Sequence, residues 1–143
     1  MTILAAVDGD YEEDEVVRTG FDLANAYDES LAALHVVSNA EFADRQDSTP
    51  DYYLDDAEEA ARGLARRVTR GTLGGIGDTE FRGEVGPVAE TVIDVAHEMD
   101  ARYLVVGGRK RSPVGKALFG SKTQTLLMDA DRPVVSVMRD DED

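Results

Sequence analysis

Short apolar runs alternate with amphipathic segments along the chain, and this alternation sets the predicted fold. Runs of apolar residues at 3–7, 31–37, 103–106 and 133–138 are typical of buried strands. The stretch Thr79 to Val85 alternates apolar and polar residues instead, which predicts a half-exposed strand at an edge of a sheet. After each of the first four strands, apolar residues recur at helical spacing. The pattern therefore predicts strands and helices in regular alternation.

This order of elements predicts an α/β fold, because strands that alternate with helices form parallel sheets with right-handed crossovers. We expect one domain over residues 1–143, with a single doubly wound five-stranded parallel sheet and helices on both faces. Ligands of such folds bind outside the carboxyl ends of strands, where the connections diverge. Asp8 and the glycines after residue 106 both follow strands. A ligand that touches both requires strands one and four to be neighbours, which gives the order 3-2-1-4-5.

Several other segments carry more local predictions. The polar stretch 39–50 predicts a surface loop that partly covers the carboxyl ends of the strands. Of the two histidines, His35 is expected to be a hydrogen-bonded core residue and His97 a surface residue. Tyr52 and Tyr53 either stack on a planar ligand or pack the start of the following helix.

The segment from residue 107 to residue 123 differs in charge from the rest of the chain. It contains all three lysines and two arginines, and no acid lies between residues 103 and 128 of a chain whose net charge is −15. A basic loop with exposed backbone N–H groups, followed by a helix N-terminus, favours phosphate. The residues that would supply N–H donors or positive charge include Arg109, Lys110, Ser121, Lys122 and Thr123. The alternative is a glycine-containing loop with surface cations that binds nothing.

Composition excludes several classes of function. The chain has no cysteine and only two histidines, which excludes disulfides and thiolate metal sites and argues against a histidine metal centre. No apolar run reaches the length of a membrane span and the N-terminus lacks a cationic region, so we expect a cytoplasmic protein. The net charge of −15 opposes binding to nucleic acid or anionic membranes. Acids spread over every helix, with three lysines against twelve arginines, resemble the composition of proteins from extreme halophiles.

Two related phosphate motifs fit less well. The sequence GKALFGSKT at 115–123 has one residue too many for a Walker A loop, because Ser121 separates Gly120 from Lys122. The loop after the first strand, 8–12, is acidic, whereas pyrophosphatase relatives of this fold have a loop rich in serine and glycine there. An acidic loop would repel phosphate, so the predicted phosphate site stays with the basic segment.

Six pieces of sequence, in order, together resemble the universal stress protein family. They are AAVDG at 5–9, LHVV at 34–37, VGP at 85–87, LVVGGR at 104–109, FGS at 119–121 and RPVVSV at 132–137. The resemblance covers nearly the whole chain. It implies an adenine-nucleotide fold whose ATP-binding members share the pattern Gly, two residues, Gly, nine residues, Gly, then Ser or Thr. Gly107, Gly120 and Ser121 match this pattern, while Lys110 occupies the middle glycine position.

The resemblance also implies a role for individual residues. The adenine pocket would be lined by Ala6 and Val7, with contacts from Asp8 and the backbone of Val36. Val106 and Gly107 would contact the nucleoside, and the phosphates would lie against Lys110, Gly120, Ser121 and Lys122. Lys110 either crowds the phosphates, because a side chain stands where backbone would approach, or supplies charge to them.

Three functions remain open on these grounds. The first is an ATP- or AMP-binding regulatory protein of the stress response, in which occupancy changes surface or assembly. The second is a protein that binds no nucleotide and acts through dimerisation and partner binding. The third is a slow ATPase that uses Mg²⁺ held by the phosphates and Asp8. No general base is found beside the phosphate segment, which argues against catalysis. Whichever function holds, the resemblance implies a homodimer, formed through the fifth strand at 133–138, whose apolar residues would otherwise leave an exposed sheet edge.

Overall fold

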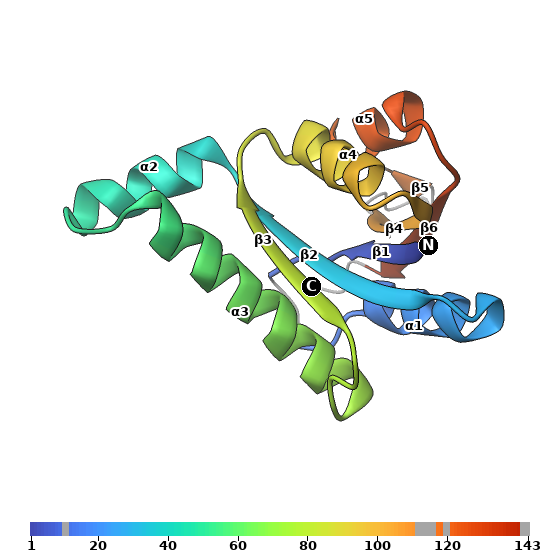
Figure 1. Cartoon of the computed structure of the whole chain (residues 1–143). Helices are drawn as coiled ribbons and strands as arrows, with labels where there is room; N and C mark the ends of the chain where they lie inside the picture. Colours follow the sequence, from blue (N-terminus) through green and yellow to red (C-terminus); the bar gives the residue numbers. More distant parts are fainter. Residues whose placement is uncertain (10–11, 111–116, 119–120, 141–143) are drawn as a thin grey trace.

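The structure, a computed structural model, describes residues 1–9, 12–110, 117–118 and 121–140. Figure 1 shows a sheet with helices on both faces. The strands are β1 (Thr2–Ala6), β2 (Ser30–Val37), β3 (Glu80–Val85), β4 (Ala101–Lys110), β5 (Ala117–Leu118) and β6 (Val134–Asp140). The helices are α1 (Glu15–Tyr27), α2 (Asn39–Ser48), α3 (Leu54–Leu73), α4 (Val88–Glu98) and α5 (Ser121–Asp129).

Five of the strands form a parallel sheet in the order β3-β2-β1-β4-β6. This confirms the predicted order 3-2-1-4-5, because β6 is the fifth of the parallel strands. β3 lies at one edge, as its alternating sequence predicted. The additional strand, β5, has two residues and pairs antiparallel with Arg109 and Lys110 of β4.

Each face of the sheet has its own core. On one face α1 and α3 pack over side chains such as Ile3, Ala5 and Val105, and Figure 1 shows both helices on the same side. On the other face α4 and α5 pack over Leu4 and Leu104. Because neighbouring residues of a strand point to opposite faces, a strand buried on both sides must be apolar throughout. This explains the continuous apolar runs in β1, β2 and the first half of β4.

Helix α1 begins and approaches the sheet for identifiable reasons. Asp14 is its N-cap, with a carboxylate that accepts from the Val16 N–H at 3.0 Å. Gly20 is buried, and a Cβ there would lie 3.0 Å from Leu31 Cδ1 and 3.4 Å from Ala5 Cβ. The missing side chain lets the helix lie close to β1 and β2.

The prediction of a surface loop over 39–50 is wrong, because Asn39–Ser48 form helix α2. The helix begins with a capping box in which Glu41 N–H donates to Ser38 Oγ at 3.1 Å, and Ser38 N–H donates to Glu41 Oε1 at 3.5 Å. None of its residues is buried, so it has no apolar stripe for the periodicity to detect. Figure 1 shows α2 projecting away from the layers of the sheet.

The tyrosines that precede α3 differ in surroundings. Tyr52 packs on Phe42 of α2, with ring centroids 6.1 Å apart, and the guanidinium carbon of Arg45 lies 4.9 Å from its ring centroid. Tyr53 is 61% exposed. Of the two predicted alternatives, packing at the start of the helix therefore describes Tyr52.

Strand β4 is longer than predicted. It continues to Lys110, so residues 107–110 belong to the strand and not to a loop. Its last residues pair with β6, up to Lys110 opposite Asp140, while β1 has already ended. β5 pairs with the edge of β4 opposite to β6, which is the edge that β1 leaves open. Pairing with strands far along the chain extends β4 beyond its apolar run.

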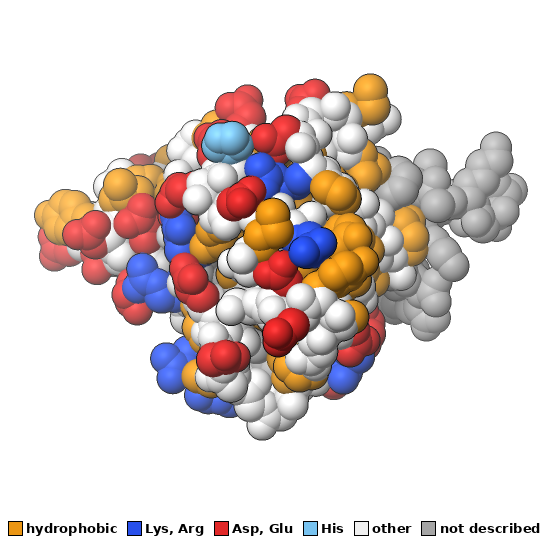
Figure 2. Space-filling view, turned by 45° about the vertical axis from the view of Figure 1, so that its right-hand side comes forward, with side chains coloured by type: hydrophobic (Ala, Val, Ile, Leu, Met, Phe, Trp, Pro, Cys, Tyr) orange, Lys and Arg blue, Asp and Glu red, His pale blue; other side chains and the backbone are white. Residues whose placement is uncertain are grey.

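Acidic side chains cover much of the surface. Figure 2 shows them scattered over the visible face with basic side chains between them, and no single acidic patch dominates that face. Within the ranges that the structure describes, no helix combines the length and the apolar character needed to cross a membrane.

Candidate functional site

The candidate site lies at the carboxyl ends of β1 and β4, where the chain leaves the sheet toward opposite faces. β1 and β4 are neighbours, and their pairing ends with Ala5 opposite Val105. After β1 the chain leads to α1 on one face, and after β4 it leads to α5 on the other. Such a switch point is where ligands of open α/β sheets bind. Asp8 and Gly107 lie just beyond the last paired residues, as the sequence predicted.

The apolar residues predicted to contact the adenine or the nucleoside lie at this end of the sheet but on both of its faces. Val36 and Val106 are buried in the core under α4, where Ala6 also packs. Val7 belongs to the core on the α1 and α3 side and is 6% exposed. The backbone of Val7 continues the pairing with β2, because its N–H donates to Leu34 O at 2.8 Å. Hydrogen bonds between β1 and β2 therefore hold the backbone at this end of the site.

A side-chain hydrogen bond joins the phosphate side of the site to β4. Thr123 Oγ1, in the first turn of α5, donates to Gly107 O at 2.9 Å. Lys122, its neighbour, is exposed. The N-terminus of α5 is thereby held next to the end of β4, with at least one basic residue on its first turn.

Some predicted phosphate ligands cannot be placed in full. Gly120 lies outside the described residues, as does the basic segment 111–116. Arg109 and Lys110 are described as backbone at the end of β4, and Ser121 as the first residue of α5. The roles of these residues stay predictions.

Sequence reasoning missed the support of the loop that carries Asp8. Asp14 is 1% exposed, and its Oδ2 accepts from the Asp8 N–H at 3.3 Å. Its own N–H donates to Thr72 Oγ1 of α3 at 2.9 Å. Asp14 stands in front of the apolar positions of α1, where a capping residue is expected, so its place as N-cap was readable. The contact with Thr72 had no signal in the sequence.

His97 lies at the surface, as predicted, whereas His35 makes the predicted hydrogen bond but is only half-buried. His35 Nδ1 donates to Val7 O at 3.0 Å, since a carbonyl can only accept, and the ring is half-buried. His97 is exposed and bonds to Asp131 Oδ2 at 3.1 Å. Two hydrogen bonds lower the pKa of Asp131 from 3.8 to about 2, with the larger effect from Arg132 and the smaller from His97.

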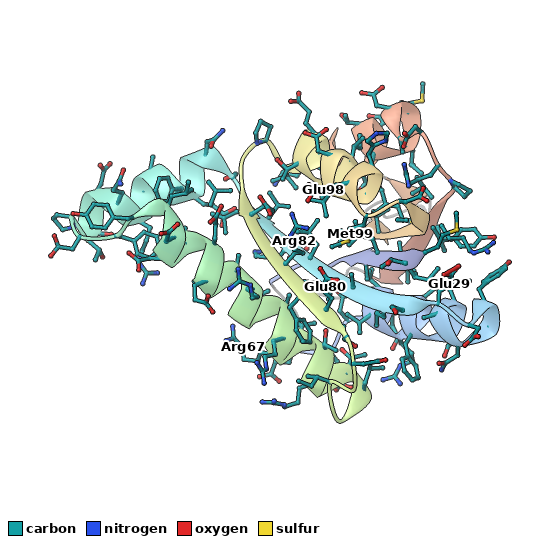
Figure 3. All side chains as sticks on the ribbon, viewed as in Figure 1. Glu29, Arg67, Glu80, Arg82, Glu98 and Met99 are labelled. Atoms are coloured by element: carbon teal, nitrogen blue, oxygen red, sulfur yellow. The ribbon has the colours of Figure 1, made fainter. Side chains whose placement is uncertain are left out.

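Other charged side chains form pairs within the fold. Figure 3 shows Arg82 on β3 lying toward Glu98 of α4, and its guanidinium lies 2.9 Å from Glu84 and 3.4 Å from Glu98. Burial opposes the charge of Arg82, but the hydrogen bond and charge of Glu84, with help from Glu98, leave its pKa raised. The hydrogen bond from Arg102, at 3.0 Å, leaves the pKa of Glu29 below its usual value despite opposing desolvation. Within the described part of the chain, no three acidic or histidine side chains are grouped to hold a metal ion.

Comparison with known proteins places nearly the whole chain in one family. Residues 1–137 match the model of the universal stress protein family. A universal stress protein of Mycolicibacterium smegmatis is 31% identical over 147 aligned residues, which cover 98% of this chain and 49% of that protein. The chain spans about half the length of the curated relatives it matches.

Solved structures have the same fold. A universal stress protein in complex with cAMP has a TM-score of 0.62 and 22% identity, covering 96% of this chain and 95% of its own. The universal stress protein from Archaeoglobus fulgidus in complex with dAMP has a TM-score of 0.57 and 20% identity, covering 96% of this chain and 97% of its own. Fold, order of strands and the match over residues 1–137 agree, and the chain belongs to the universal stress protein family.

Proposed function

We propose that this protein is a regulatory protein of the stress response that binds an adenine nucleotide at the carboxyl ends of β1 and β4. The observation that carries the proposal is the switch point itself, with Asp8 after the end of β1 and Gly107 in the part of β4 that extends beyond its pairing with β1. Two proteins of the same fold are complexes with adenine nucleotides, cAMP and dAMP. A base between the ends of β1, β2 and β4 is the arrangement that this geometry favours.

Each part of the nucleotide has a proposed set of contacts. The adenine lies against Ala6, Val7, Asp8 and the backbone of Val36, and the Asp8 carboxylate accepts from the exocyclic amine. The nucleoside lies along Val106 and Gly107. The phosphates take N–H donors and positive charge from Arg109, Lys110, Gly120, Ser121, Lys122 and Thr123. Helix N-termini and basic side chains favour such anions.

The proposed ligand is ATP or AMP, and Mg²⁺ would be bound chiefly by the phosphates. Mg²⁺ commonly keeps several waters and binds through one or two carboxylates together with substrate phosphates. Binding without a catalytic cycle fits the basic segment better, because no acid lies within it to act as a base. We place the protein in the cytoplasm.

The nucleotide itself provides the test. The protein is purified in molar salt, and any nucleotide released on denaturation is identified by mass spectrometry. The stripped protein is then titrated calorimetrically with AMP, ATP and GTP, with and without Mg²⁺. We expect adenine nucleotides to bind with a Kd of about 1 μM or tighter, which is about −8 kcal/mol, and GTP to bind more weakly. No released nucleotide and no heat would contradict the proposal and favour a protein that acts on partners without a nucleotide.

We also propose a homodimer through β6. This strand lies at the edge of the sheet, and within the described residues it pairs with β4 alone. Residues 134–138, four of which are apolar, are all half-buried, so pairing with a second copy would cover both the free edge and these side chains. Light scattering in molar salt should give twice the mass of 15.5 kDa at micromolar concentration. A monomer mass over the whole concentration range would contradict the dimer.

A further inference from the structure

The loop between β1 and α1, which carries Asp8, lies along the C-terminal half of α3. A Cβ on Gly9 would lie 2.9 Å from Leu64 Cδ1. A Cβ on Gly71 would lie 2.5 Å from Glu12 O, so the backbone of the loop lies directly on the helix there. The Asp14 N–H donates to Thr72 Oγ1 at 2.9 Å. Three positions spread over two turns of α3 therefore support one loop.

The contact with Thr72 is linked to Asp8 through a single buried side chain, that of Asp14. Asp14 is 1% exposed, and its two carboxylate oxygens accept from Val16 N–H at 3.0 Å and from Asp8 N–H at 3.3 Å. Its backbone N–H is bound by Thr72. Thr72 thus fixes Asp14, and Asp14 fixes both the start of α1 and the backbone of Asp8.

We propose that Thr72 is a positioning residue of the nucleotide site, which acts through Asp14 to hold Asp8 in place for the adenine. The inference rests on the proposed function. Thr72 is 5% exposed and lies in the last turn of α3, so it supports the site from the protein interior. The backbone of the same residue is fixed as well, since Arg18 donates to Thr72 O at 2.8 Å.

The hydroxyl of Thr72 makes two hydrogen bonds that a methyl group cannot make. It donates to Val68 O at 2.7 Å, within α3, and accepts from the Asp14 N–H at 2.9 Å. Replacement by valine keeps the shape but removes the acceptor for Asp14. A buried N–H without a partner is costly, so the loop would shift to satisfy it. Asp8 would then lose its fixed position.

The same helix supplies a matched control. Thr69 is 0% exposed and, like Thr72, donates its hydroxyl to the carbonyl four residues before it, at 2.9 Å. No hydrogen bond from Thr69 to the β1–α1 loop is present among the described residues. Thr69→Val and Thr72→Val therefore remove the same intrahelical bond from a buried site, and only Thr72→Val removes the support of Asp14.

The test compares wild type, Thr72→Val, Thr72→Ser and Thr69→Val by AMP titration and by NMR hydrogen exchange of the backbone amides. We expect Thr72→Val to weaken AMP binding about tenfold and to speed exchange of the Asp8 and Asp14 amides. Thr72→Ser, which keeps the hydroxyl, should restore both, and Thr69→Val should match wild type in both.

Two outcomes would overturn the inference. One is equal exchange of the Asp8 amide in Thr72→Val and Thr69→Val. The other is an equal loss of AMP affinity in these two variants, which would mean that any loss of a buried hydroxyl in α3 has the same effect. If wild type binds no AMP, the proposed function fails by itself, while the exchange rates still decide whether Thr72 holds Asp8.

Discussion

Replacement of Gly83 by valine should destabilise the protein by about 3–5 kcal/mol, a large part of the stability of a typical domain. Gly83 is buried in β3, opposite His35 of β2. A Cβ there would lie 2.2 Å from Glu58 O and 2.5 Å from Arg62 N, which are backbone atoms of α3. Backbone atoms cannot adopt another rotamer as a side chain can, so the whole helix would have to move away from the sheet. Urea unfolding followed by circular dichroism measures the loss.

Gly63→Ala in the same helix is the control for this variant. Gly63 is exposed, and a Cβ there would meet nothing within 4 Å. Since alanine favours a helix over glycine, we expect this change to stabilise the protein by about 0.5–1 kcal/mol. A Gly83→Val variant as stable as wild type would show that α3 does not lie against β3 as described.

Replacement of Gly107 by valine should weaken binding of adenine nucleotides at least about a hundredfold, or about 3 kcal/mol. Gly107 lies at the end of β4 beyond the last residue paired with β1, where we place the nucleoside. A branched side chain would take up that space. The fold should persist, because valine is well suited to a strand. Calorimetric titration with AMP and ATP measures the change in affinity, and circular dichroism checks the fold.

The control variant Gly75→Val separates loss of the nucleotide site from a general effect of the added side chain. Gly75 lies in the connection from α3 to β3, and a Cβ there would meet nothing within 4 Å. This connection leads into the amino end of β3, away from the candidate site. Gly75→Val should therefore bind nucleotide like wild type. Unchanged affinity in Gly107→Val would contradict the placement of the nucleoside at the end of β4.

The sheet could be predicted because burial on both faces leaves a clear pattern. β1 and β2 must be apolar throughout, and β3 alternates because it lies at an edge. The order of the strands followed from placing Asp8 and Gly107 on one ligand. Helix α2 was missed because none of its residues is buried, although Ser38 and Glu41 carry the sequence of a capping box. Amphipathic periodicity detects only helices that cover a core.

The end of β4 and the support of the site depended on contacts between distant parts of the chain. Residues 107–110 have no apolar pattern, and β6 pairs with them along their full length. Thr72 and Asp14 are 58 residues apart, and threonine near a helix end is common enough to carry no signal. Charge and glycine spacing predict the chemistry of the site, and this stays a prediction, while the groups that hold its loop became visible only in three dimensions.

The exposed position of α2 has a consequence for the evolution of this protein. Its ten residues contribute nothing to either core, so most substitutions there cost little stability as long as the helix still begins and ends in place. Such a segment can acquire new surface chemistry while the sheet stays the same. Diversification of surface residues among paralogues is therefore expected to be well tolerated there.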